Sequence, residues 1–325
     1  MNTTKRLLRE YGLILCIVVI VIIATIIRPA FLSFSNIMNI LRAYSTIGIA
    51  SIGMTFAIIC GGMDLSVGAT VSLTVVFTML VINATVVGAY SPVYATILVI
   101  LLGLFIGATV GAINGTIIAS VNGRMGESFI ITYAMQIIIA AAAVATVKGT
   151  FQAAKYSEGL FKQLGIGFFP ILFFITTAVV MQIILTKTEF GRHMYFLGAN
   201  MNAAKMSGIK IKQTRIFAHI LCGACAGLAG VLIVSRVNSA STFQGLGYEL
   251  DAMASVAVGG TSLAGGSGSV LKTVMGVLVI GVLLNALNIL GIKSDAQLIV
   301  RGSVIILAVI LDAWNKRAML KEVAK

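Results

Sequence analysis

Long runs of apolar residues, separated by short polar segments, follow one another along this 325-residue chain. A helix needs roughly 20 mainly apolar residues to cross the hydrocarbon layer of a membrane, and most of the runs approach that length. We therefore predict an all-α polytopic membrane protein with about ten transmembrane helices, within a range of roughly 8–11. The predicted spans are residues 11–27, 44–60, 66–87, 93–121, 128–147, 168–186, 216–234, 251–263, 270–290 and 296–313.

Two of these runs, residues 44–60 and 251–263, are short for a span, and each leads into a glycine-rich polar segment. The first break covers residues 61–68 and the second covers residues 259–269. Non-helical backbone at membrane depth is tolerated only where it is buried in protein or lines a water-filled cavity. We therefore expect both breaks to face the interior and to form a flexible, hinge-like lining of a pathway.

The two breaks are related in sequence. Their glycine pairs align, 61–62 with 259–260, and Leu65 then matches Leu263. Corresponding glycine-interrupted segments in the two halves of a membrane protein indicate where a transporter handles its solute. The residues predicted to form the translocation pathway or its gate are Gly61, Gly62, Asp64, Ser66, Gly68, Gly259, Gly260, Thr261, Ser262, Gly265 and Gly266.

Residues 31–42 carry apolar side chains at helical spacing just before the second span. This pattern predicts a separate amphipathic helix at the outer membrane interface. Further along the chain, glycine recurs at every fourth position from Gly103 to Gly115, and Gly223, Gly227 and Gly230 form a similar set. Such smooth helix faces are typical of close helix packing in membranes.

Composition agrees with a single transmembrane domain over residues 1–325. Hydrophobic residues make up 59% of the chain and charged residues only 10%, whereas soluble proteins carry roughly 25% charge. The net charge of +13 does not indicate nucleic acid, because the basic residues lie in loops and tails. A cytoplasmic N-terminus places 15 of them inside and seven outside, with Arg301 in the last span. Cationic loops favour the cytoplasmic side, so both termini are predicted there.

Asp64 is the one carboxylate that we expect well away from a loop or a chain end. An unpaired charge in the membrane costs several kcal/mol, so the sequence must compensate for it. We expect Asp64 to cap the span at 66–87 by accepting hydrogen bonds from the amides of Ser66 or Val67. A direct contact with solute, or a role in gating, is the alternative.

No catalytic residue, metal ligand or cofactor site is predicted. Cys222 and Cys225 have the spacing of a redox or metal pair, but no second pair completes a site, so they are expected to be packing residues. Residues 266–273 approach a phosphate-binding loop, yet Leu271 stands where the loop needs glycine and no strand precedes it. If ATP drives the protein, another subunit must hydrolyse it.

The longest inward loop, residues 187–215, contains a short helix with its own caps. Asn200 is an N-cap residue and Gly208 a C-terminal glycine, and Met201, Ala204 and Met206 with Ile209 form its expected apolar side. A helix this short is unstable without a partner. It either rests on the membrane surface or docks to a cytoplasmic partner.

These segments together resemble a known family. Residues 61–69, residues 247–251 through 260–266, and residues 111–115, 285–291 and 297–302 are similar to motifs of permease subunits of bacterial ABC importers for monosaccharides, of the ribose, xylose, arabinose and galactose type. That family belongs to the branched-chain amino acid and sugar permease superfamily. The resemblance implies the fold of type II ABC importer permeases and a location in the inner membrane.

The resemblance also implies partners. The short helix is similar to the family's coupling helix, which seats in a groove of a cytoplasmic ABC ATPase subunit. A periplasmic or lipid-anchored sugar-binding protein would deliver the solute, and a second permease chain, identical or paralogous, would complete the pathway. The residues implied in coupling to the ATPase are Asn200, Ala203, Ala204, Lys205, Met206, Ser207, Gly208 and Ile209.

Departures from the family pattern leave the sugar open. Residues 126–133 lack the usual proline-containing approach, and the outer loop at 148–167 lacks the usual Gly-Pro-rich pattern. We thus expect the permease of an ATP-driven importer. The alternatives are an ion-coupled secondary transporter, which must bury ionisable groups and has only Asp64, and a membrane enzyme, which needs a polar constellation at depth. His193 and His219 are expected at the interface.

Overall fold

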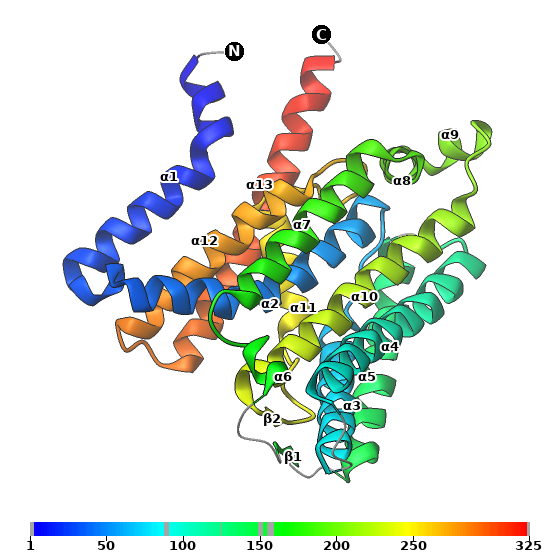
Figure 1. The fold of residues 1–325 in the computed structure, drawn as a ribbon. Coiled ribbons are helices and arrows are strands. Elements are labelled where there is room, and N and C mark those ends of the chain that lie inside the picture. The colour runs from blue at the N-terminus through cyan, green and yellow to red at the C-terminus, as the bar shows by residue number, and fades with distance from the viewer. Residues whose placement is uncertain (1–2, 88–90, 124, 149–151, 155–158, 324–325) are drawn as a thin grey trace.

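The computed structural model describes residues 3–87, 91–123, 125–148, 152–154 and 159–323, and within them the chain is almost entirely helical (Figure 1). Two short strands, β1 (Gln152–Ala153) and β2 (Ser239–Ala240), pair antiparallel. The predicted all-α polytopic membrane fold is confirmed. Among the described residues seven helices are long and apolar enough to cross a membrane. They are α2 (Phe34–Ile59), α3 (Val67–Val87), α4 (Pro92–Ser120), α5 (Met125–Val147), α7 (Phe169–Lys187), α10 (Ile211–Val237) and α12 (Val270–Ile289).

The other predicted spans are also helical but fall outside that group. In α1 (Thr3–Ile27) the apolar part is Ile14–Ile27, and α13 (Ser294–Val323) ends in a charged segment. The helix α11 (Tyr248–Val258) has 11 residues, which rise about 16 Å, half of what a span requires. Short helices complete the order: η1 (Pro29–Leu32), α6 (Leu160–Gln163), α8 (Glu189–Ala199) and α9 (Met201–Met206).

The predicted separate helix at residues 31–42 is wrong. After η1, a single continuous helix α2 runs from Phe34 to Ile59, and the Ser33 side chain caps it by accepting from the Asn36 amide. Arginine is a good helix former, so Arg42 does not end the helix, and its guanidinium donates to the carbonyl oxygen of Gly167 at 2.7 Å. The amphipathic segment and the span that follows it are therefore one element.

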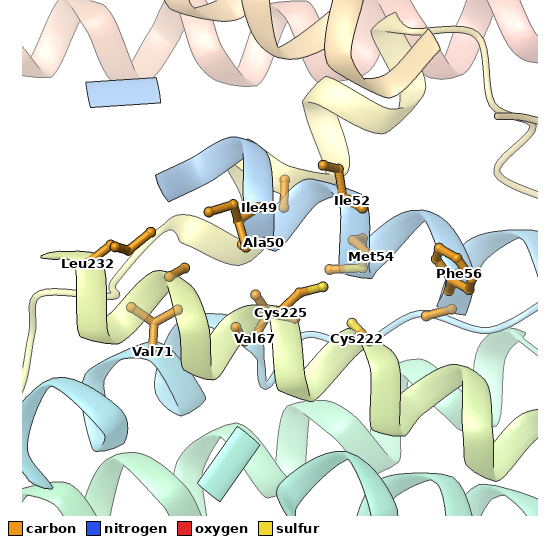
Figure 2. Close-up of a cluster of buried hydrophobic side chains, with 14 of the residues drawn as sticks. Ile49, Ala50, Ile52, Met54, Phe56, Val67, Val71, Cys222, Cys225 and Leu232 are labelled. Carbon is orange, nitrogen blue, oxygen red and sulfur yellow. The ribbon is translucent and has the colours of Figure 1, made fainter. Parts of the chain in front are cut away.

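The core lies where α10 crosses α2, α3 and α4. Figure 2 shows buried side chains of α2, among them Ile49, Met54 and Phe56, in one cluster with Val71 of α3 and Cys225 of α10. The cysteines of α10 are buried and free, as expected of packing residues.

The glycine faces predicted for close packing lie in the same core, on α4 and α10. A Cβ atom added to Gly107 would lie 2.0 Å from the carbonyl oxygen of Gly223, and one added to Gly227 would lie 1.9 Å from that of Gly103. The two backbones are thus in direct contact, and the packing role is confirmed.

The helices are arranged so that α1 begins and α13 ends on the side of the molecule where α8 and α9 lie, while β1 and β2 lie on the opposite side (Figure 1). This arrangement agrees with the prediction that both termini and the inward loop, residues 187–215, lie on the same side of a membrane. Arg124, Lys155 and Lys325, which entered the charge count, lie outside the described residues. The cytoplasmic assignment of that side stays a prediction.

The contact between α4 and α10 predicts a selective effect of small substitutions. Gly107→Ala must push the two helices apart, and overpacking of this kind costs about 1–3 kcal/mol. Gly302→Ala on α13 is the matched control, because nothing lies within 4 Å of its added Cβ. We expect a lower midpoint of thermal unfolding in detergent for Gly107→Ala alone. Equal midpoints for the two variants would contradict the packing.

Candidate functional site at the two glycine breaks

Both breaks begin with the same helix cap. At the end of α2 the amide of Gly61 donates to Ile58 and that of Gly62 to Ala57, and Gly61 has φ +83°. At the end of α11 the amide of Gly260 donates to Ala257 and that of Thr261 to Val256, and Gly260 also has φ +83°. This is the Schellman pattern, whose left-handed residue is usually glycine.

The shared cap corrects the alignment of the breaks by one residue. Gly61 corresponds to Gly260, not to Gly259, because these two hold the left-handed position. Gly259 takes the place of Cys60, the last right-handed residue of the helix. It is glycine for another reason: an added Cβ would lie 2.3 Å from the carbonyl oxygen of Lys272. The second glycine pair therefore combines two separate requirements: Gly260 supplies the left-handed turn, and Gly259 leaves room for the Lys272 carbonyl.

The two breaks contact each other and the end of α8. The amide of Gly266 donates to the carbonyl oxygen of Ile59 at 2.9 Å. A Cβ on Gly198 would lie 1.9 Å from that oxygen, and one on Gly265 would lie 2.9 Å from the Cα of Gly61. We call this meeting point of Gly61, Gly198, Gly265 and Gly266 the glycine junction. It brings both halves of the chain and the inward loop to one point.

A second link ties α8 to the second break. The hydroxyl of Tyr195 donates to the carbonyl oxygen of Gly268 at 2.7 Å. Burial raises the pKa of the Tyr195 phenol, so the hydroxyl keeps its proton at physiological pH and remains a donor. The last turns of α8 are thus fixed to the second break by a side chain as well as by backbone packing.

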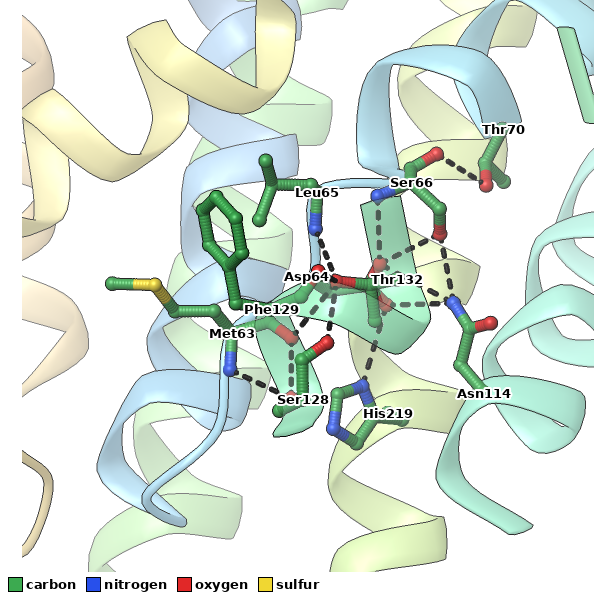
Figure 3. A network of polar contacts seen from close by, with 10 residues as sticks. All are labelled: Met63, Asp64, Leu65, Ser66, Thr70, Asn114, Ser128, Phe129, Thr132 and His219. Carbon is green, nitrogen blue, oxygen red and sulfur yellow. Dashed lines mark hydrogen bonds and ion pairs between the residues drawn. The ribbon is translucent and has the colours of Figure 1, made fainter. Parts of the chain in front are cut away.

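Polar side chains hold the first break in place (Figure 3). Asp64 is buried and accepts from the amide of Ser66 at 3.0 Å and from its hydroxyl at 2.6 Å. The side-chain nitrogen of Asn114 on α4 lies 3.3 Å from both carboxylate oxygens, and Nδ1 of His219 on α10 lies 3.3 Å from Oδ2. The predicted cap onto Ser66 is therefore present, within a larger network.

Side chains of α5 satisfy the backbone of the same break. The Ser128 hydroxyl accepts from the amide of Met63 at 3.0 Å and donates to its carbonyl at 2.7 Å, and the Thr132 hydroxyl accepts from the amide of Leu65 at 3.0 Å. Buried backbone groups without partners are costly. The first break is thus a hydrogen-bonded segment, and the hinge-like role expected of it stays a prediction.

The short helix of the inward loop is α9, capped as the sequence predicts. The Asn200 side chain accepts from the amides of Asn202 and Ala203, and Gly208 has φ +77°. Its apolar residues do not share one side, however. Ala204 is fully buried, with Met201 and Ile209 packed against the core, whereas Met206 is 90% exposed. The exposed residues of this segment, which could meet a partner, are Asn200, Asn202, Ala203, Lys205, Met206, Ser207 and Gly208.

Comparison with known proteins agrees with this architecture. A family model described as a branched-chain amino acid transport system permease component matches residues 36–309. The chain belongs to this permease family. The resemblance stated from the motifs is therefore confirmed, and the chain is a transport component rather than an enzyme.

Several curated relatives cover nearly the whole chain. The ribose import permease protein of Bacillus subtilis (strain 168) is 39% identical over 310 residues, 94% of this chain and 93% of the relative. The L-arabinose transport system permease protein of Escherichia coli (strain K12) is 30% identical over 317 residues, 96% and 93% of the two chains. A probable ABC transporter permease protein of the same strain is 36% identical over 312 residues, which are 95% of this chain and 90% of the relative. No solved structure matches this chain.

Sequence reasoning missed the burial of His219, Glu249 and Asp251 in this permease. His219 was expected at the interface but is 2% exposed. Glu249 and Asp251 on α11 are also buried, so Asp64 is not the only deep carboxylate. One signal was available for Asp251: Arg301 lies inside an apolar run and needs an anion. The structure supplies it, with Nη1 of Arg301 3.1 Å from Oδ2 of Asp251.

The remaining residues predicted for the pathway differ in exposure. Ser66 is buried, and Gly68 lies against Glu249. At the second break Thr261 and Ser262 are buried, and within the described residues their hydroxyls have no hydrogen-bond partner. Gly260, beside them, is exposed. Their role in a pathway stays a prediction.

The network around Asp64 predicts a large effect on stability. Asp64→Ala leaves the amide and the hydroxyl of Ser66 without their acceptor, at about 1–3 kcal/mol for each buried group. Asp64→Asn keeps one acceptor oxygen and should cost less. Asp295→Ala, at an exposed carboxylate on α13, is the control. Thermal unfolding in detergent measures the order, and an Asp64→Ala variant as stable as the unmodified protein would refute the network.

Proposed function

We propose that this chain is the transmembrane permease subunit of an ABC importer that carries a monosaccharide or a related small polar solute across the inner membrane. A separate cytoplasmic ATPase would drive it. The glycine junction is the observation that carries the proposal, because it connects the exposed inward loop directly to both breaks. The names of the relatives, ribose and L-arabinose permeases, support a sugar as solute.

The geometry suggests how force would reach the breaks. At Gly198 the backbone of α8 touches the carbonyl of Ile59 with no side chain between them, and Tyr195 holds the second break. A displacement of α8 therefore cannot be absorbed by side-chain rotation. It must move the ends of α2 and of the second break together, which would open or close a path between them.

The exposed side of α9 would be the contact for the ATPase. A short capped helix with one face buried in its own protein and the other free suits docking into a groove. Lys205 and Met206 lie on the free face. Ala204 would act indirectly, by fixing α9 to the body. A binding protein would deliver solute on the opposite side, and a second permease chain would pair with this one, symmetric pairing being the usual arrangement.

An ion-coupled secondary transporter remains the second candidate, because the structure buries more carboxylates than the sequence suggested. Secondary transporters need such groups to bind H⁺ or Na⁺. Asp251 is paired with Arg301, however, and Asp64 lies beside His219. Family membership favours the ATP-driven importer. Uptake by the isolated chain under an ion gradient, without ATPase or ATP, would decide for the second candidate.

The docking role of α9 predicts the effect of one charge reversal. Lys205→Glu should abolish ATP-driven uptake, because it replaces a positive by a negative charge on the docking face. The variant should remain folded, since Lys205 is exposed. Lys293→Glu is the matched control, since Lys293 is exposed in the loop between α12 and α13. Uptake and ATP hydrolysis by the reconstituted complex, with D-ribose and L-arabinose as probes, measure the difference.

Two results would count against this assignment. If the Lys205→Glu variant and a Met206→Glu variant on the same face both support normal uptake, α9 does not dock. If Lys293→Glu is equally inactive, the effect is one of net charge.

A further inference from the structure

One side of α11 is left uncovered by the rest of the described chain. Leu246, just before the helix, is 73% exposed and Leu250 is 46% exposed. Met253 and Ala257 follow at helical spacing and are half-buried. This stripe, which we call the open side of α11, continues into the second break, where Gly260 and Ala264 are exposed.

Polar groups border the open side on both edges. Successive helix residues are rotated by about 100°, so Glu249 and Asp251 lie on either side of Leu250. Glu249 is 7% exposed, and its Oε1 accepts from the Gln136 amide of α5 at 3.3 Å. Asp251 is paired with Arg301 of α13, whose side chain is 33% exposed.

The pair formed by Gln136 and Glu249 has unused hydrogen-bonding capacity. Within the described residues, Oε2 of Glu249 and Oε1 of Gln136 have no hydrogen-bond partner. Buried polar groups without partners cost about 1–3 kcal/mol each. Such groups are retained where a ligand or water completes them. Both atoms belong to one contact between α5 and α11, which borders the open side and lies against Gly68 of α3.

The surroundings exclude lipid as the cover of this side. Gln136 and Arg301 are both partly exposed, and polar groups facing hydrocarbon carry a high cost. Water, or a protein surface enclosing water, is the cover consistent with these partly exposed polar side chains.

We propose that the open side of α11 lines the solute path and that Glu249 and Gln136 together bind the hydroxyl groups of a polyhydroxylated solute. A carboxylate accepts from hydroxyls, and an amide both donates and accepts. Leu250 offers an apolar surface to the C–H face of the same solute. This assignment rests on the proposed function, since it names the place where the imported solute is held.

Thiol accessibility tests the environment without reference to any solute. Gln136→Cys and Leu250→Cys are placed in a Cys16→Ser background, because the other three cysteines are buried. Ile138→Cys is the control, since Ile138 is 61% exposed on the same helix but about 200° away from Gln136. The reagent is a water-soluble, membrane-impermeant methanethiosulfonate, applied to the complete complex in membranes.

We expect both open-side thiols to react at least about tenfold faster than the Ile138→Cys thiol, because only a thiolate in water is reactive. Equal rates at positions 136 and 138, or no reaction at position 250, would overturn the assignment of this side to a water-filled path.

Solute binding is tested by Glu249→Gln, with Asp295→Asn as the matched control. We expect the KM for the transported probe, D-ribose or L-arabinose, to rise roughly tenfold in Glu249→Gln, the effect of losing one charge-assisted hydrogen bond. ATP hydrolysis stimulated by the binding protein should persist, which a merely structural role would not allow.

An unchanged KM would overturn the binding role of Glu249 even if the thiols react as expected. If the unmodified complex takes up neither sugar with ATP, the proposed function fails, and the thiol rates alone then decide whether the open side faces water.

Discussion

Backbone that leaves the helix inside a membrane must find hydrogen-bond partners within the protein, and this constraint organises the centre of the molecule. The second break supplies one partner for the first, through the amide of Gly266 and the carbonyl of Ile59. Helix α5 supplies others from Ser128 and Thr132. Because the partners come from distant parts of the chain, neither break can take its shape alone.

Glycine serves this constraint in two different ways. Gly61 and Gly260 allow the left-handed turn that ends each helix. Gly198 and Gly259 have no need of that conformation, but they lie where a Cβ would collide with another backbone. The contact between α4 and α10 is of the second kind and extends over several turns. It makes α10 a rigid support, against which α8 and the breaks can be displaced.

Local patterns predicted the local elements. Apolar runs located the helices, and the caps of α9 followed from Asn200 and Gly208 because a cap depends on neighbouring residues only. What failed depends on distant residues. The packing of α2 includes a contact between Arg42 and the distant Gly167 carbonyl, and the register of the breaks depends on which glycine faces Lys272. Burial of His219 and Glu249 is likewise set by packing, not by position in the chain.

The distribution of buried charged residues bears on the energy source that drives transport. Two of the three deep carboxylates lie beside a basic side chain, Asp64 beside His219 and Asp251 beside Arg301. These groups need no added ion to be tolerated in the interior. Glu249 accepts instead from the side-chain amide of Gln136, and it borders the open side of α11. In the proposed importer, none of these three carboxylates supplies the energy for transport. The displacement would come from α8 and α9, through the glycine junction.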